Sequence, residues 1–209
     1  MEYKAASLLC NILVFAVTLL IVILYFRGED GKGDPAKGRW YLRFFTTLSN
    51  IFSAAACAVM AAAVCFSGGG SGSFMTAAVH IKFLATVTVM ITLLTVIFFL
   101  APSAGFAAMF QKETFHMHLV GPLLAFLSFC FLEQQVVISR KWILIGTVPM
   151  LLYGALYLYK VVVKGEDNGG WPDFYGFNKN GKWYVSIAAM LAANLLICAA
   201  LRFLHNMFV

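Results

Sequence analysis

Charged residues are scarce in this chain. Only 11% of its 209 residues are Asp, Glu, Lys or Arg, and 62% are hydrophobic, whereas soluble domains carry about 25% charged residues. A single chain of this length cannot bury so much apolar surface in water. The composition therefore excludes a soluble domain and indicates an integral membrane protein.

Motifs for metal and redox chemistry are also lacking. The five cysteines lie inside apolar runs and none belongs to a CxxC pair, so neither a disulfide framework nor a zinc site is indicated. We expect no metal and no other cofactor. No internal repeat of the kind that builds many transporters is visible. The net charge of +6 needs no nucleic acid, because basic loops at an anionic membrane surface account for it.

Long apolar runs, in contrast, are abundant. A spanning helix needs about 20 mostly apolar residues, and six such runs follow one another along the chain. We predict an all-α fold, a bundle of six membrane-spanning helices that forms a single domain over residues 1–209. The predicted spans are residues 5–26, 42–66, 75–101, 115–134, 142–163 and 183–204.

Lysine and arginine are concentrated on one side of the predicted bundle. The loops after the first, third and fifth spans lie on that side, and the Gly-rich segment 67–74 lies on the other. The positive-inside rule places the charged loops in the cytoplasm and both termini outside, in the plasma membrane if the organism is prokaryotic. The basic residues on the charged side are Arg27, Lys32, Lys37, Arg39, Arg43, Lys112, Lys160, Lys164, Lys179 and Lys182.

The second predicted span carries polar side chains along one face. Their spacing of i, i+4, i+7 and i+11 is that of residues on one side of a helix. Such a stripe is either a close helix contact in which Ser, Thr and Asn bond to neighbouring helices, or the polar wall of a functional site. The stripe consists of Thr46, Asn50, Ser53 and Cys57.

The fourth predicted span contains a histidine close to the depth of Thr46. Both spans begin on the charged side, so we expect His118 and Thr46 at similar levels. An ionisable residue inside a membrane is costly and indicates function, and imidazole exchanges protons near neutral pH. The alternative is a histidine that bonds to a neighbouring carbonyl. Pro122 predicts a kink, because it leaves the carbonyl of residue 118 without a backbone donor. His116 faces another direction and is the weaker candidate.

Thr46 and His118 together meet the minimum requirement for acyl transfer. A threonine hydroxyl attacks an ester only when an adjacent base accepts its proton, and the developing oxyanion needs a hydrogen-bond donor. The amide of Asn50 is the candidate donor. The second and fourth spans contain no Asp or Glu at this depth, so Asp173 in the last loop is the candidate for an orienting carboxylate.

Three segments resemble the androgen-induced and androgen-dependent transmembrane hydrolases. They are "RFFTTLSN" (43–50), "FHMHLVGPLL" (115–124) and "GWPDFYGFN" (170–178). The resemblance implies Thr46 as nucleophile, His118 as general base, and hydrolysis of fatty acid esters of hydroxy fatty acids. Thr47 remains the alternative nucleophile, since a shift of one residue turns the side chain by about 100° around the helix.

Polar residues on the later spans have two interpretations. Tyr153, Tyr157 and Lys160 are spaced i, i+4 and i+7. They either line an entrance for a fatty-acid carboxylate or anchor the fifth helix at the membrane surface. In the sixth span, Asn194 either joins Asn11 of the first in a polar cavity or bonds between helices.

Ionisable residues also occur at the opposite membrane face. Lys82 and His80 enter the third span where Glu133 leaves the fourth, and we expect a snorkelling ion pair there, too far from His118 to share its site. Threonines of the third span are expected to bond only to their own helix. They are Thr88, Thr92 and Thr95.

Two classes of function follow. The first is an intramembrane lipid esterase that hydrolyses fatty-acyl esters with a threonine nucleophile and a histidine base, and whose partners are that ester and the membrane lipids. The second is a non-catalytic lipid-binding or transport protein that uses the same polar cavity. Acyl transfer to an acceptor other than water requires the same residues as hydrolysis.

Overall fold

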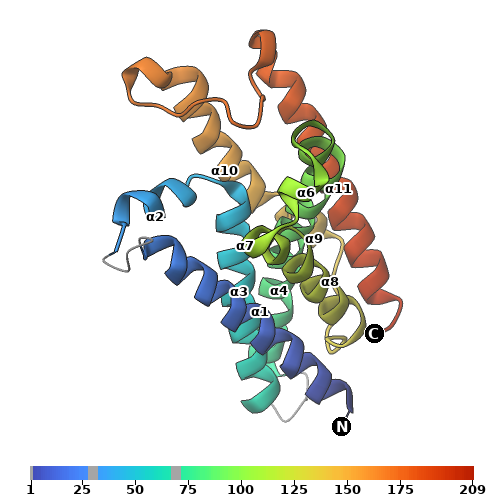
Figure 1. The fold of residues 1–209 in the computed structure, drawn as a ribbon. Helices are drawn as coiled ribbons and strands as arrows, with labels where there is room; N and C mark the ends of the chain where they lie inside the picture. The colour runs from blue at the N-terminus through green and yellow to red at the C-terminus, as the bar shows by residue number, and fades with distance from the viewer. Residues whose placement is uncertain (1, 28–32, 67–71) are drawn as a thin grey trace.

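The computed structural model describes residues 2–27, 33–66 and 72–209 (Figure 1). The expectations for Lys32 and for residues 67–71 fall outside these ranges. Within them the chain is helical and contains no strand, which confirms the all-α fold. Six helices of the described chain are long and apolar enough to cross a membrane, so this is a multi-pass membrane protein. They are Tyr3–Phe26, Phe45–Phe66, Ser73–Ala104, Lys112–Phe131, Lys141–Lys164 and Trp183–Asn206.

A short separate helix precedes the second span. α1 (Glu2–Phe26) is followed by α2 (Pro35–Tyr41), whose first turn is capped by Asp34: the carboxylate accepts a hydrogen bond from the Lys37 amide at 2.9 Å. Pro35 suits the first turn because it has no N–H to satisfy there. α3 (Phe45–Phe66) therefore begins at Phe45 and not at residue 42. The apolar run extends back to residue 42 because Leu42 and Phe44 are apolar, although both lie in the turn between the two helices.

Each proline inside a span follows an irregular stretch of helix. Proline cannot donate the backbone hydrogen bond that the preceding turn needs, so the helix widens or breaks there. η1 (Val96–Leu100) precedes Pro102, η2 (His116–Val120) precedes Pro122, and the break between α9 (Lys141–Ile145) and α10 (Val148–Leu158) precedes Pro149. The sequence predicted the irregularity at Pro122, and the structure shows it as a π-helical turn that includes His118.

The centre of the bundle is formed by α3, α4 (Ser73–Thr95) and α8 (Gly121–Phe131), with α1 packed against α3 and α8. Fully buried alanines on α3 and α4 allow close approach of these helices, as is common between membrane helices. Larger side chains fill the remaining space. The core includes Met60, Ala63, Ala78, Phe83, Val87, Phe129 and Cys198.

α10 and α11 (Trp183–Asn206) flank this centre on one side (Figure 1). η3 (Tyr159–Lys164) continues α10, and a largely irregular connection, which we call the strap (residues 165–182), leads from it to α11. Both termini lie toward the end of the bundle opposite the strap (Figure 1). The remaining short elements are α5 (Ala101–Ala104), α6 (Phe106–Met109), α7 (Lys112–Phe115), η4 (Glu166–Asn168) and η5 (Lys179–Gly181).

Candidate functional site

A cavity of about 360 Å³ lies between the first turn of α3, the end of α4 with η1, and the facing sides of α10 and α11. The strap closes one end of it. Most of the wall is apolar, and polar groups are few. The lining residues are Phe45, Thr46, Ile91, Thr92, Thr95, Val96, Phe99, Leu100, Met150, Tyr153, Gly154, Tyr157, Tyr175, Gly176, Phe177, Val185, Ser186, Ala189, Met190 and Ala193.

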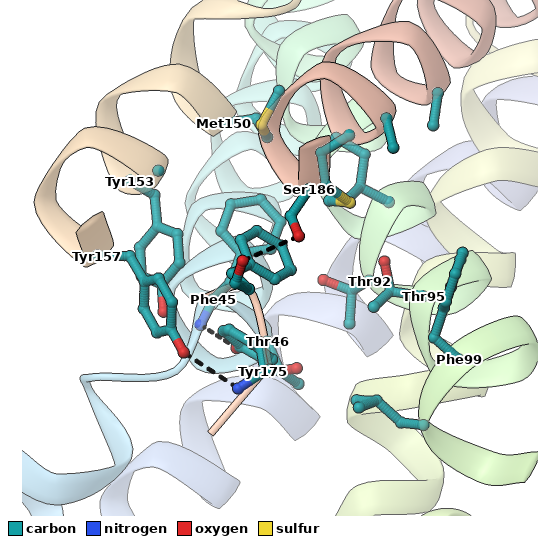
Figure 2. Close-up of a pocket in the computed structure, with 18 of the residues that line it drawn as sticks. Phe45, Thr46, Thr92, Thr95, Phe99, Met150, Tyr153, Tyr157, Tyr175 and Ser186 are labelled. Carbon is teal, nitrogen blue, oxygen red and sulfur yellow. Dashed lines mark hydrogen bonds between the residues drawn. The ribbon is translucent and has the colours of Figure 1, made fainter. Parts of the chain in front are cut away.

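Thr46 lies at the strap end of the cavity, beside the phenol of Tyr175 (Figure 2). The Tyr175 oxygen accepts a hydrogen bond from the Phe45 amide at 2.9 Å, which holds this side chain next to Thr46 (Figure 2). Free amides at a helix start need such acceptors. Burial raises the pKa of the Tyr175 phenol, so this group is neutral at physiological pH. Thr46 thus combines cavity exposure with a neutral hydrogen-bonding neighbour.

Thr47 lies elsewhere. Its side chain is buried and does not line the cavity, because it is turned by about 100° from Thr46 on the same helix. Of the two candidate nucleophiles, only Thr46 has its side chain on the cavity wall.

The two tyrosines of the fifth span line the cavity. Their hydroxyls form hydrogen bonds to the backbone before α3 and to the strap. Tyr153 donates to the Arg43 carbonyl at 2.7 Å, and Tyr157 donates to Asp173 Oδ1 at 2.8 Å. The Tyr157 oxygen also accepts from the Tyr175 amide at 3.1 Å (Figure 2). Both side chains therefore belong to the cavity wall, whereas an entrance for a fatty-acid carboxylate stays a prediction. Lys160 is half-buried and is not part of the lining.

Asp173 organises the strap. Besides Tyr157, it accepts hydrogen bonds from the amides of Phe177 at 2.9 Å and Asn178 at 2.8 Å. These bonds fold the strap over the cavity and bring Tyr175 to the start of α3. The carboxylate has no contact with His118, so its expected role as the orienting group of that histidine finds no support here.

His118 is buried in η2, and its Nδ1 lies 2.7 Å from the carbonyl oxygen of Met109. A carbonyl only accepts, so Nδ1 carries the proton and Nε2 is left with its lone pair. This contact matches the alternative interpretation of a histidine bonded to a neighbouring carbonyl, and it also selects the tautomer that a general base needs. His118 is not among the cavity-lining residues, and the described chain contains no hydrogen bond between it and Thr46.

Asn50 has a different role from the expected oxyanion donor. Its amide nitrogen donates to the carbonyl oxygens of Thr46 at 2.8 Å and Met117 at 2.9 Å, so both of its hydrogens are engaged. The same amide ties the first turns of α3 to η2. Ser53, also expected on the site wall, is buried beside Cys57 and does not reach the cavity.

The opposite end of the polar stripe meets a buried ion pair. The Lys82 ammonium is 3.9 Å from the Glu133 carboxylate, and both side chains are 0% exposed. Lys82 donates to Asn11 Oδ1 at 2.6 Å and contacts Cys57 Sγ at 2.9 Å, while Asn11 donates to Glu133 at 2.6 Å. The pairing was expected but the snorkelling was wrong, because Asn11, Ser7 and Cys57 supply polar partners inside the bundle.

The hydrogen-bond partners expected for Asn11 and for the threonines of the third span also differ from those in the structure. Asn11 bonds to this ion pair and not to Asn194, which contacts Cys198 of its own helix at 3.5 Å. Thr88 bonds to its own helix, as expected, whereas Thr92 also bonds to the Ser49 hydroxyl at 2.8 Å. The bond from Asn11 to Glu133 and the bond between Thr92 and Ser49 join different parts of the chain, and spacing along one helix cannot reveal them.

Tyr175 is the site residue that sequence reasoning missed. It belongs to "GWPDFYGFN", an aromatic segment already prominent in the sequence, but its position against Thr46 depends on how the strap folds. No protein-family model, curated protein or solved structure matches this chain. The geometry of the site therefore has to carry any functional conclusion.

Proposed function

We propose that this protein is an intramembrane lipid esterase that hydrolyses fatty-acyl esters, with Thr46 as nucleophile and His118 as general base. We also propose that it belongs to the family of the androgen-induced and androgen-dependent transmembrane hydrolases. The observation that carries it is the position of the Thr46 hydroxyl at the polar end of an otherwise apolar cavity. An acyl chain fits such a wall, and its ester group would meet Thr46 and the tyrosine hydroxyls.

The cavity is also accessible from the lipid. Phe99 lines it although 71% of this side chain is exposed, and Val185, on α11, lines it at 53% exposure. Both residues belong to membrane-spanning helices. A lipid substrate would therefore enter sideways, from the bilayer, without crossing water.

One side chain connects the backbone of Thr46 to that of the residue before His118. The side-chain amide of Asn50 donates hydrogen bonds to the backbone carbonyls of both Thr46 and Met117. His118 is the next residue after Met117. Catalytic hydrogen bonds are often long before substrate binds and tighten in the complex. In this proposal Nε2 turns toward Thr46 on binding, while Nδ1 stays on the Met109 carbonyl.

The reaction would proceed in two steps. Thr46 Oγ attacks the ester carbonyl carbon, His118 Nε2 takes the hydroxyl proton, and the same proton then passes to the departing alcohol. Water next attacks the acyl-threonine with His118 again as base, which releases the fatty acid and restores Thr46. The neutral phenol of Tyr175 replaces Asn50 as the proposed donor to the oxyanion.

Lipid binding without turnover is the second candidate function. It is favoured by one observation, that His118 bonds to Met109 and is absent from the cavity wall. In that case Thr46 and the tyrosines would only bind the polar end of a lipid.

Labelling with a fluorophosphonate tests the two candidates. We expect purified wild-type protein in detergent to form an adduct on Thr46, and we expect Thr46→Val and His118→Ala to abolish labelling. Thr47→Val is the matched control and should label normally, since Thr47 faces away from the cavity. Peptide mass spectrometry locates the adduct.

The result that would reject the esterase is equally specific. Undiminished labelling or ester hydrolysis in Thr46→Val would exclude Thr46 as nucleophile. Absence of any adduct on folded protein, together with intact lipid that co-purifies without releasing fatty acid over time, would establish the binding function instead.

A further inference from the structure

The length of the cavity is limited along the helix axes. On α10, Tyr157 at the strap end and Met150 at the far end are seven residues apart, and on α11 the same separation joins Ser186 and Ala193. At 1.5 Å rise per residue, both pairs span about 10 Å, and the lining residues of α4 and η1, from Ile91 to Leu100, span about 13 Å. Figure 2 shows Met150 at the end away from Thr46 and Tyr175. The cavity is thus shorter than one leaflet of a bilayer, which is about 15 Å deep in hydrocarbon.

The two ends of the cavity differ in chemistry. Thr46, Tyr157 and Tyr175 bring hydroxyl groups to the strap end, and Ser186 is tied there to the Phe177 carbonyl at 3.0 Å. The far end is formed by Met150, which is only 8% exposed, and by the exposed Ala193, and both side chains are apolar. An amphiphilic ligand therefore has one favourable orientation, with its polar group at Thr46 and its methyl end at Met150.

The cavity has room for a single chain. Its volume of about 360 Å³ lies near the lower limit of ligand pockets, which run from about 300 to 1,000 Å³. Small residues along its length, Gly154 on α10 and Ala189 on α11, leave the space in which a chain would lie. A two-chain lipid would have to leave one chain in the bilayer.

We propose that this cavity selects a single acyl chain of medium length, shorter than the chains of bilayer phospholipids, and that Met150 and Gly154 set the length limit. This inference rests on the proposed function for the identity of the reacting group but not for the binding of the chain. A limit on chain length would let the enzyme discriminate against the esters of the surrounding bilayer. An esterase embedded in phospholipid meets long-chain esters at very high concentration, and a short cavity disfavours them because their last methylenes find no wall beyond its far end and must turn out through its exposed side.

Gly154 offers the sharpest test. A β-carbon added at this position meets no atom within 4 Å, so a larger side chain can project into free space without disturbing the helix. We expect Gly154→Leu to shift the preferred chain by roughly three methylenes toward shorter chains, since the leucine occupies about that much of a close-packed cavity. Ala155→Leu is the matched control, because Ala155 is exposed and is not part of the lining.

Binding is measured separately from turnover. A photoactivatable fatty acid is crosslinked to purified protein, and unlabelled fatty acids from hexanoic to stearic compete with it. For wild type we expect the competing affinity to rise about fourfold per methylene, to peak at medium length and then to fall. Met150→Ala should move the peak toward longer chains. Its expected shift in preferred chain length is thus opposite to that of Gly154→Leu.

The outcomes separate this inference from the esterase proposal. A chain-length peak that shifts in Gly154→Leu but not in Ala155→Leu supports the length limit even if no variant hydrolyses an ester. An affinity that keeps rising to stearic acid, or an unchanged peak in both Gly154→Leu and Met150→Ala, overturns it. Ester hydrolysis without chain-length preference would retain the esterase and reject the length limit.

Discussion

Lys82 and Glu133 show how burial changes the role of a charged residue. Long side chains at the membrane surface usually extend toward water, yet these two are 0% exposed. Each finds polar partners inside the bundle, since Asn11 bonds to both of them. The pair therefore connects α1, α4 and the end of α8 at the side of the molecule opposite the strap.

Removing one partner should be much more harmful than removing both. We expect Lys82→Met to lower the free energy of unfolding by about 3–5 kcal/mol, because Glu133 then remains buried without a cation. Lys82→Met combined with Glu133→Gln should recover most of this loss. Unfolding in detergent, followed by circular dichroism, measures both. Lys141→Met, at an exposed position, serves as the control, and a double variant as unstable as the single one would contradict the explanation.

At the scale of elements, three departures from regular helix lie directly before a proline, whereas η3 is irregular without one. The chain after Pro122 continues as the regular helix α8. The turn before it, His116–Val120, is the wider η2. This widening includes His118 and lets its ring reach back to the carbonyl of Met109. A regular helix would orient His118 differently, so the proline acts on the candidate base through the backbone.

Two glycines in helices are expected to respond in opposite ways to the same substitution. A β-carbon at Gly38 would overlap the ring of Phe26, where α2 packs on the end of α1, whereas one at Gly154 meets nothing within 4 Å. We expect Gly38→Ala to cost about 1–3 kcal/mol of stability through overpacking. Gly154→Ala should add about 0.5–1 kcal/mol, since alanine favours helix.

Thermal unfolding of the two variants beside wild type provides the measurement. Equal effects of Gly38→Ala and Gly154→Ala would mean that α2 does not pack on α1 in the way described. A loss of stability in Gly38→Ala alone would support this contact.

At the scale of the whole molecule, the spans differ in how much they contribute to the core. The most apolar stretch of the third span is 56% buried, but that of the sixth is only 17% buried. α11 thus faces mostly lipid, and together with α10 it forms the outer wall of the cavity. This asymmetry explains why the cavity lies beside the bundle centre, with exposed residues in its outer wall.

Orientation in the membrane is a property of the whole chain and can be tested directly. Both termini lie at the end opposite the strap (Figure 1), and the positive-inside rule places the strap side in the cytoplasm. In a bacterial host we expect alkaline phosphatase fused after Val209 to be active and the same enzyme fused after Lys164 to be inactive. The reverse pattern would show that the bundle is inserted the other way.

The sequence by itself determined the membrane class and the six spans, while the similar depth of Thr46 and His118 stays a prediction. Hydrophobicity summed over about 20 residues is a strong signal, and the alternation of spans orders residues by depth. Only the tertiary structure decided which hydroxyl faces the cavity, since Thr46 and Thr47 differ by a rotation about the helix axis. It also decided that Asn50 bonds to two carbonyls, that Lys82 is buried and that Tyr175 reaches Thr46. These outcomes depend on contacts between helices, and the spacing of residues along one helix does not contain them.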